Sequence, residues 1–285
     1  PGLRQPSHGT KDSSIHLHRP SAVRPCCVPT CLTKVPVATF AHLVYYYMGE
    51  IYTERKRKMY RLCIFDLDGT LLNTINALTY TTNVTLSALG LGQIVPEQTK
   101  KMVGDGYKKQ MERALMACGD ENLVHYEEAL TLYMENFAKY CMKDVKPYDG
   151  IPQLLEYLKK KGMKIAVYSN KPHHQAVENI ETIFGKDYFD CVRGEQAGTP
   201  KKPAPDGALI VCRELGMQPG DCLYLGDTNT DMKTGIAAGM DTVGVTWGFR
   251  DREELVALSP QYIVDYPSQV ELIIEKADTG NEDLQ

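Results

Sequence analysis

Apolar and polar residues between positions 60 and 275 follow two alternating patterns. Short apolar runs predict buried strands near Arg61–Asp66, Lys164–Ser169, Phe189–Val192, Cys222–Gly226 and Thr242–Thr246. Amphipathic stretches such as Pro205–Leu215 lie between these runs and predict helices. Strands that alternate with helices are typical of parallel sheets covered on both faces. The pattern therefore predicts an α/β fold built on a doubly wound parallel sheet.

A purely helical pattern fills the long interval between the first two strands. From Glu121 onward the apolar positions recur every three or four residues, at Leu123, Tyr126, Leu130, Tyr133, Phe137 and Tyr140. Pro96 is expected to open an earlier helix, and Gly90 and Gly119 lie where helices would end. We therefore expect a helical cap domain of residues 74–146, inserted into a core of residues 59–73 and 147–275, with residues 276–285 as a tail.

Residues 1–58 show neither the apolar spacing of a helix nor the apolar runs of a strand. They carry Pro, Arg and His and end in a basic run, Arg55–Lys58, directly before Met59. We expect them to form a leader outside the fold, and we expect the native chain to start at Met59 or Met48. The apolar piece Val35–Met48 is shorter than the about 20 residues that a membrane span needs.

Composition narrows the class of protein. The 285 residues are 43% hydrophobic and 24% charged, which is typical of a soluble chain long enough for one domain and a smaller second one. The formal charge of −4, without a basic stripe interleaved with aromatics, argues against nucleic acid as a partner. The nine cysteines, several of them in apolar runs, indicate buried thiols in a reducing compartment. We therefore expect a cytoplasmic protein with no membrane partner.

The first strand ends in two acids one residue apart, Asp66 and Asp68, which Gly69 and Thr70 follow. Alternate residues of a strand point the same way, so both carboxylates can reach one ligand. Two carboxylates at one strand end repel each other and lose hydration together, which is costly unless a cation compensates them. The alternative is a strand that runs into an Asx turn at Asp68.

Three later segments carry polar groups that, taken alone, have ordinary explanations. Ser169 and Asn170 can form a turn after a strand, and Lys202 can be a solvated lysine. Asp227 can cap a helix that has Asp231 in its first turn. Ligands of a doubly wound sheet collect outside the carboxyl ends of its strands, where all of these residues map. Their combination favours a functional site.

In this order the four motifs resemble those of the haloacid dehalogenase superfamily of phosphohydrolases. They are Asp66-x-Asp68-Gly-Thr, Ser169, Lys202 and Gly-Asp227-x-x-x-Asp231. The resemblance spans about residues 60 to 275, and it is strongest to the phosphoglycolate phosphatase-like branch with a helical cap. It implies a phosphatase that hydrolyses a small, phosphoglycolate-like phosphomonoester through an aspartyl-phosphate intermediate.

The resemblance also implies catalytic roles. Asp66 would be the nucleophile, and Asp68 would protonate the leaving oxygen and then activate the water that releases phosphate. Ser169 and the main-chain N–H of Asn170 would bind phosphoryl oxygens. Lys202 would supply positive charge, which is needed because a carboxylate and a phosphate repel each other by about 4 kcal/mol per unit pair at about 4 Å in a protein-like dielectric.

The implied cofactor is Mg²⁺. Its ligands would be Asp66, the main-chain carbonyl of Asp68, and Asp227, completed by phosphate oxygens and water. Asp231 would support Mg²⁺ or Lys202 rather than bind the metal directly. The sequence contains no Gly-x-Gly-x-x-Gly or P-loop motif, so a nucleotide cofactor is not implied.

Other functions fit some of the same motifs. A phosphomutase of the β-phosphoglucomutase type or an inorganic pyrophosphatase shares all four and differs in what the cap admits. A dehalogenase is disfavoured because, by resemblance, it lacks the second acid and the metal. A phospho-receiver signalling domain also places an Asp beside a Lys and Mg²⁺, but it has no place for a long helical insertion. The expected partner is a small phosphorylated substrate, and the expected assembly is a monomer or homodimer.

Specificity is expected to come from the cap. Its loop Gly104–Tyr107 is flanked by basic residues that could meet an anionic leaving group, namely Lys100, Lys101, Lys108, Lys109 and Arg113. The alternative is a solvated basic helix face. His173 and His174 follow the Ser169 turn closely and are expected to be solvated rather than catalytic.

Overall fold

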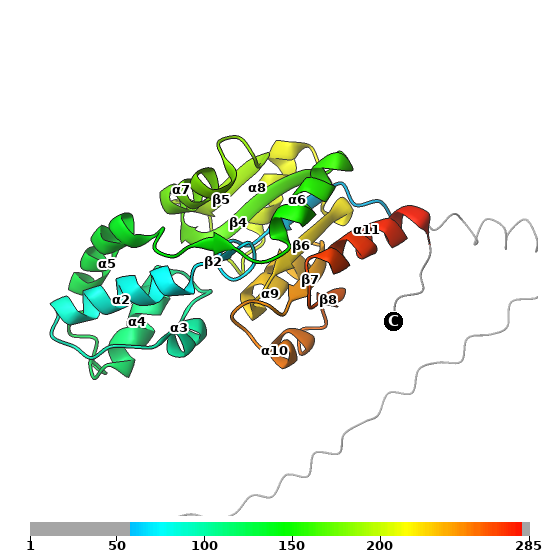
Figure 1. The fold of residues 1–285 in the computed structure, drawn as a ribbon. Coiled ribbons are helices and arrows are strands. Elements are labelled where there is room, and N and C mark those ends of the chain that lie inside the picture. The colour runs from blue at the N-terminus through cyan, green and yellow to red at the C-terminus, as the bar shows by residue number, and fades with distance from the viewer. Residues whose placement is uncertain (1–57, 281–285) are drawn as a thin grey trace, which may run out of the picture. The chain divides into compact units, whose positions relative to one another are not determined.

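Six parallel strands form the main sheet of the protein, which a computed structural model describes over residues 58–280. The strand order is β5-β4-β1-β6-β7-β8 (Figure 1). The bounds are β1 Leu62–Phe65, β4 Lys164–Pro172, β5 Cys191–Glu195, β6 Cys222–Gly226, β7 Asp241–Val245 and β8 Tyr262–Val264. The predicted leader lies outside the described residues, except for Lys58.

The first five of these strands are those that the apolar runs predict, within one to three residues at most ends. Strand β8 is not apparent from the sequence. It has three residues, of which Val264 is buried and the other two are half-buried, and it pairs with β7 at the edge of the sheet. Its three apolar residues are fewer than the four to eight that indicate a buried strand in a sequence.

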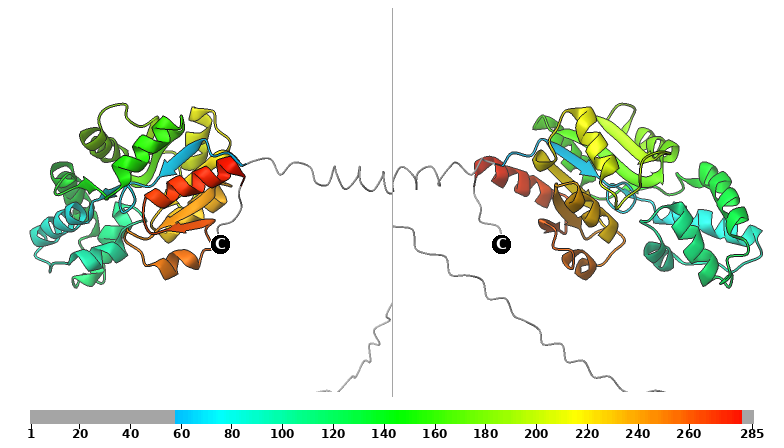
Figure 2. Two further views of the ribbon diagram at one scale, coloured as in Figure 1. Left: turned by 45° about the vertical axis from the view of Figure 1, so that its right-hand side comes forward. Right: turned by 180° about the vertical axis from the view of Figure 1, so that it is seen from behind.

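Helices cover both faces of the sheet. They are α6 Ile151–Lys160, α7 His173–Phe184, α8 Asp206–Leu215, α9 Asn229–Ala237, α10 Arg252–Val256 and α11 Ser268–Thr279, with a 3-10 turn at Pro219–Asp221. In the left view of Figure 2, α6 and α11 (green and red) lie in front of the sheet, whereas α8 and α9 (yellow) lie in front when it is seen from behind. The predicted doubly wound α/β fold is thereby confirmed. Helix α11 extends past residue 275, where the core is expected to end.

Four helices occupy the long interval between β1 and β4. They are α2 Ile75–Ala88, α3 Pro96–Met102, α4 Tyr107–Ala117 and α5 Tyr126–Tyr140. We call this segment, residues 75–140, the helical insertion. Two short antiparallel strands, β2 Leu72–Asn73 and β3 Lys146–Pro147, join it to the sheet domain. The insertion has a hydrophobic cluster of its own, which includes Met111, Leu115 and Phe137.

The start of α5 differs from the prediction. The helix begins at Tyr126 rather than at Glu121, and Leu123 lies before it with a left-handed φ of 54°. The carboxylate of Asp120 accepts the N–H groups of Val124 and His125 instead. A side chain that binds nearby backbone N–H groups holds the chain in a turn, so the apolar spacing alone extends the helix too far.

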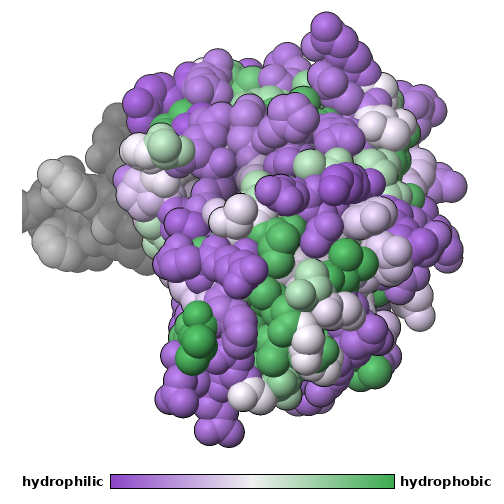
Figure 3. Space-filling view, turned by 90° about the vertical axis from the view of Figure 1, so that its left-hand side faces the viewer, coloured by the Kyte–Doolittle hydropathy of each residue, from purple (hydrophilic) through white to green (hydrophobic). Residues whose placement is uncertain are grey.

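The end of the molecule that the insertion forms carries apolar side chains within a mostly hydrophilic surface (Figure 3). Val95, Met116 and Val124 of the insertion are more than 45% exposed. The prediction of a monomer or homodimer stays a prediction.

Within residues 58–280, none of the helices has the length and apolar character that crossing a bilayer requires. The six cysteines of this part of the chain are free thiols.

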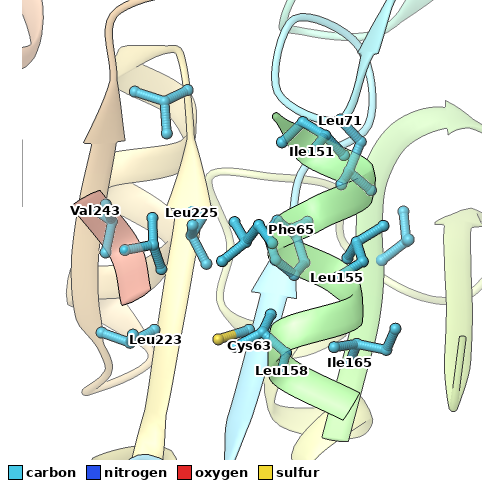
Figure 4. Packing of buried hydrophobic residues seen from close by; sticks show 14 of the residues in the cluster. Cys63, Phe65, Leu71, Ile151, Leu155, Leu158, Ile165, Leu223, Leu225 and Val243 are labelled. Atoms are coloured by element: carbon cyan, nitrogen blue, oxygen red, sulfur yellow. The ribbon is translucent and has the colours of Figure 1, made fainter. Parts of the chain in front are cut away.

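Alternate residues of β1 enter two separate hydrophobic cores. Cys63 and Phe65 face α6, whose Leu155 and Leu158 point toward the strand (Figure 4). Leu62 and Ile64 pack on the opposite side with residues of α8. All four β1 side chains are fully buried, and burial of one such side chain stabilises the fold by about 1.5–3 kcal/mol. The strand is thus fixed in place, and so is the residue that follows it.

Candidate active site

The predicted site residues converge at the carboxyl end of the sheet. Asp66 directly follows β1, Asp227 directly follows β6, and Ser169 and Asn170 lie in the last part of β4. Strands β4, β1 and β6 are neighbours in register, so these ends meet at one edge. One pocket is lined by residues of the sheet domain and of the insertion, including Asp66, Asp68, Ser169, Asn170, Lys171, Lys202, Gly104, Gly106, Gln110, Tyr133 and Phe137.

Lys202 lies between two carboxylates. Its Nζ is 2.8 Å from Oδ1 of Asp66 and 2.7 Å from Oδ1 of Asp231, and its side chain is 2% exposed. Burial alone lowers the pKa of Lys202, but the charges of Asp231 and Asp66 outweigh it and raise that pKa well above its ordinary value. Lys202 is therefore a permanent cation, and the alternative of a solvated lysine is wrong.

Asp66, Asp227 and Asp231 form a compact acidic cluster, with one carboxylate oxygen of each within 4.8 Å of the others. Burial, followed by the charge of Asp231, raises the pKa of Asp66 from 3.8 to about 7. Burial, followed by the charges of Asp231 and Asp66, raises the pKa of Asp227 well above its ordinary value. With all three acids ionised, the cluster and Lys202 carry an excess of two negative charges, which one divalent cation would balance.

The donor atoms of this cluster suit a hard divalent cation. Oδ1 of Asp66 is buried, and its partner among the described residues is the Lys202 ammonium at 2.8 Å. A carboxylate oxygen has two lone pairs, so Asp66 keeps capacity for a cation. Mg²⁺ binds such oxygens through one or two carboxylates and keeps its remaining positions for water or phosphate. The residues present therefore fit the implied metal.

Asp227 is held by its neighbours in one orientation. Its Oδ1 accepts the Thr70 hydroxyl at 2.9 Å and its Oδ2 accepts the Phe249 N–H at 2.8 Å. Gly69 and Gly248 lie so close to this carboxylate that a Cβ atom on either would overlap it. Each oxygen of a carboxylate has two lone pairs, so Asp227 retains capacity for a cation.

Asp231 is occupied by other partners. Its Oδ2 accepts the N–H and the hydroxyl of Thr228, the N-cap of α9, at 3.1 and 2.6 Å. Its Oδ1 accepts from Lys202 at 2.7 Å. Both carboxylate oxygens of Asp231 thus have partners among the described residues, and its supporting role stays a prediction.

Asn170 joins three loops. Its Oδ1 accepts the main-chain N–H of Lys202 at 2.8 Å, and its Nδ2 donates to the carbonyls of Lys202 and Gly104 at 3.1 and 3.0 Å. The amide side chain of Asn170 is therefore occupied. Its predicted contact with a phosphoryl oxygen relies on the main-chain N–H instead. The hydroxyl of Ser169, also buried, accepts the N–H of Lys171 at 3.3 Å.

Asp68 pairs with a second buried lysine. Its Oδ1 accepts from Nζ of Lys171 at 2.8 Å, and the Lys171 side chain is 2% exposed. Sequence reasoning does not identify Lys171 as a site residue. The available signal is its place directly after Ser169–Asn170 at the end of a buried strand. The main-chain carbonyl of Asp68, not its side chain, is the predicted metal ligand, and this role stays a prediction.

The loop between α3 and α4 of the insertion lies against the sheet domain. Lys201 donates to the Asp105 carbonyl at 2.8 Å, and the Thr230 hydroxyl donates to the Asp105 carboxylate at 2.9 Å. Arg250 donates to the carbonyls of Lys100 and Val103 at the end of α3. The pocket beneath this loop has a volume of about 40 Å³ and is partly open to solvent.

The basic residues around this loop do not face the pocket. None of Lys100, Lys101, Lys108, Lys109 and Arg113 lines it. Arg113 pairs with Asp105, and Lys109 pairs with Glu112 at 2.6 Å. The expectation that this edge meets an anionic leaving group thus finds no support.

The two histidines after β4 also lie outside the pocket lining. His174 is exposed, as expected. His173 is half-buried, and its Nδ1 accepts the N–H of Gly194 at 3.2 Å. Burial, together with nearby Arg193, lowers the pKa of His173, so this ring is a neutral structural acceptor.

A second segment that the sequence analysis does not identify is the loop after β7, residues 246–250. The Trp247 ring N–H donates to the Thr70 carbonyl at 3.0 Å, while Phe249 binds Asp227 through its N–H and packs into the cluster of the insertion through its ring. This loop therefore links the acidic cluster to the insertion.

Comparisons with known proteins agree with this geometry. Residues 63–245 match the sequence profile described as haloacid dehalogenase-like hydrolase. A phosphoglycolate phosphatase of Aquifex aeolicus is 33% identical over 211 residues, which cover 74% of this chain and 94% of the relative. An N-acetylmuramic acid 6-phosphate phosphatase of Pseudomonas aeruginosa is 28% identical over 223 residues, which cover 78% of this chain and 98% of the relative.

A solved structure gives the same result. The crystal structure of a provisionally assigned phosphoglycolate phosphatase from Lactobacillus delbrueckii subsp. bulgaricus superposes with a TM-score of 0.70 at 31% identity. The match covers 76% of this chain and 98% of that chain.

Proposed function

Because the chain belongs to the haloacid dehalogenase-like hydrolase family, we propose that it hydrolyses a small phosphomonoester through a phosphorylated Asp66, with Mg²⁺ as cofactor. The protein is a phosphatase similar to phosphoglycolate phosphatases. The observation that carries the mechanism is the placement of buried Lys202 between Asp66 and Asp231, beside Asp227 and at the wall of one pocket. This arrangement offers a nucleophile, a cation and a metal site within reach of one phosphate.

Asp66 is suited to attack phosphorus. It follows a buried strand whose four side chains fix its backbone, and its Oδ1 has the Lys202 ammonium as a partner at 2.8 Å. A bound Mg²⁺, held by Asp66 and Asp227, would supply positive charge that reduces the repulsion between carboxylate and phosphate. Lys202 supplies further positive charge and orients the Asp66 carboxylate. The Asp66 Oδ–phosphorus bond forms as the bond from phosphorus to the alcohol oxygen breaks.

Asp68 is suited to handle the proton. It lines the pocket two residues after the nucleophile, and its carboxyl is the more exposed of the two, with 17% against 7% of the side chain accessible. In this role it gives a proton to the departing alcohol and then takes one from the water that attacks the phosphorylated Asp66. Ser169 and the N–H of Asn170 are proposed to hold the phosphoryl oxygens through both steps.

The insertion is proposed to act as a cap. Its loop at Asp105 binds Lys201 and Thr230 of the sheet domain, and its helices provide Tyr133 and Phe137 to the pocket wall. A cap that closes over the substrate excludes bulk water and strengthens the charge interactions inside. Two short strand connections, β2 and β3, are the hinge about which it can open.

The substrate within the class is not fixed by family membership. Relatives of comparable identity act, by name, on phosphoglycolate and on N-acetylmuramic acid 6-phosphate. We propose a phosphoglycolate-like ester because the Aquifex aeolicus relative and the Lactobacillus delbrueckii structure are both named for phosphoglycolate. A phosphomutase would return an isomerised sugar phosphate and a pyrophosphatase would consume pyrophosphate, so product analysis separates these alternatives.

The direct test is a screen of the purified chain against small phosphate esters, with and without Mg²⁺. We expect release of inorganic phosphate with many turnovers, loss of activity after treatment with EDTA and recovery when Mg²⁺ is restored. Stoichiometric phosphorylation without turnover would indicate a receiver-type protein. Equal rates in EDTA and in Mg²⁺ would refute the metal assignment.

Mg²⁺ binding is expected to weaken as the pH falls below about 7, because protons compete with the metal for Asp66.

The raised pKa of Asp66 also makes the free energy of unfolding depend on pH. The folded, metal-free protein keeps a proton on Asp66 that the unfolded chain has lost, so this contribution to stability is present at low pH and disappears as the pH rises from 3.8 through about 7. Mg²⁺ at about 100 times its Kd is expected to raise the free energy of unfolding by about 2.7 kcal/mol. Calorimetric titration and thermal unfolding, at about pH 6 and about pH 8, would show both effects.

Gly69→Ala is expected to weaken Mg²⁺ binding and to lower activity by at least about 10-fold, because its Cβ would displace Asp227. Gly90→Ala is the matched control. Both glycines have positive φ, 90° and 70°, so both alanines carry a similar backbone strain of about 1 kcal/mol, but Gly90 has nothing near the position of its Cβ. Similar losses of metal affinity in the two variants would show that strain, and not the approach to Asp227, is responsible.

A further inference from the structure

Lys171 is a buried cation for which the proposed chemistry has no use. It lies in β4 after Ser169 and Asn170, and its ammonium is 2.8 Å from Oδ1 of Asp68 and 4.9 Å from the centre of the Phe137 ring. Only 2% of its side chain is exposed, yet it lines the pocket. A buried charge is costly unless it is well paired, so a lysine in this place requires an explanation.

The two lysines of the pocket differ in how far their charge is neutralised. Lys202 has two carboxylates within 2.8 Å, whereas Lys171 has the partly exposed Asp68. An ammonium has three N–H donors, and the contact with Asp68 occupies one of them. A carboxylate on a bound ligand can therefore join Lys171 without removing Asp68.

The positions of the two lysines also separate the two ends of a substrate. Lys202 contacts Asp66, the proposed nucleophile, so it lies at the phosphoryl end. Lys171 contacts Asp68, the proposed proton donor to the departing alcohol, and the Phe137 ring of the insertion. Its ammonium is thus beside the part of the substrate that leaves. Among the described residues that line this pocket, Lys171 and Lys202 are the two cations.

We infer that Lys171 is a specificity-determining residue whose ammonium binds a carboxylate on the leaving alcohol, an assignment that rests on the phosphatase function proposed above. The enzyme then selects phosphate esters of small hydroxy acids over neutral esters of the same size. The Lys171 side chain is 2% exposed beside the rings of Phe137 and Tyr133, so an ion pair with it is stronger than one in solvent. The basic residues around the Gly104 loop do not contribute, because they lie outside the pocket lining.

The test compares two substrates that differ by one charge, phosphoglycolate and its amide. The quantity measured is the ratio of their kcat/KM values, which does not depend on how much of a sample is folded. We expect the native protein to prefer the acid by about 10- to 100-fold, as a charge-assisted hydrogen bond predicts. In Lys171→Met and Lys171→Gln the ratio should fall to near one, and Lys171→Arg should restore part of the preference.

Lys164→Met is the matched control. Lys164 is at the other end of the same strand and also pairs with an aspartate, Asp190, at 2.6 Å. Its variant should keep the native ratio. The inference is overturned if Lys171→Met lowers both rates equally, since Lys171 would then act only through Asp68, or if the native protein hydrolyses both esters equally well. Those outcomes leave the phosphatase assignment intact, whereas failure to release phosphate from any ester would refute that assignment first.

Discussion

Asp66→Asn is expected to reduce phosphate release by about 10⁴-fold or more, because the amide oxygen is a poor nucleophile and cannot form the acyl phosphate. The fold should survive the change, since Asn fills the same volume at the end of β1 and Lys202 keeps Asp231 as a partner. Steady-state rates with a saturating ester and Mg²⁺ would measure the loss, and thermal unfolding would verify the fold.

Asp251→Asn serves as the control for this substitution. Asp251 is an exposed N-cap residue of α10, outside the pocket, and Asn is equally suited to that position. Its variant should show native rates. A rate within about 10-fold of native in Asp66→Asn would be far above what loss of a nucleophile allows and would remove Asp66 from that role.

Asp68→Asn is expected to slow hydrolysis of alkyl phosphates by about 10²- to 10⁴-fold, the usual contribution of a positioned acid or base. With an activated ester, the loss of rate should differ between the two steps, which are formation and hydrolysis of the phosphorylated enzyme. A p-nitrophenolate leaving group needs no proton, so with p-nitrophenyl phosphate the first step should remain fast while hydrolysis of the phosphorylated enzyme stays slow.

The expected signature is a burst of nitrophenol, about one per enzyme molecule, in rapid-mixing experiments on Asp68→Asn. Asp66→Asn, which lacks the nucleophile, should give no burst. If alkyl and nitrophenyl esters lost equal rate in Asp68→Asn with no burst, Asp68 would not be the residue that protonates the leaving group.

The part of this site that the sequence predicts is the part that lies at strand ends. Asp66, Ser169 and Asp227 each follow or end an apolar run, and parallel strands bring their carboxyl ends together whatever the loops do. The α/β fold was predictable for the same reason, because strands β1 and β6 are continuous apolar segments.

The residues that sequence reasoning misses reach the site from irregular segments or act through the main chain. Phe249 holds Asp227 with a backbone N–H, a group that every non-proline residue has, so its side chain gives no indication of this role. Lys171 resembles a surface lysine in sequence, and its burial depends on Phe137, which is more than 30 positions away in the insertion. The basic cluster around Gly104 shows the opposite error, since charge density alone does not reveal which face of a helix meets the pocket.

The central claim is that phosphate passes through a covalent bond to Asp66, and one measurement tests it most directly. Asp68→Asn would be mixed with substrate and Mg²⁺, quenched in acid and reduced with borohydride, which converts a phosphorylated aspartate to homoserine. Mass spectrometry of the digested protein should then find homoserine at position 66, and none should form without substrate. An unmodified Asp66 in a sample that has released its alcohol, or a label at another residue, would contradict the mechanism.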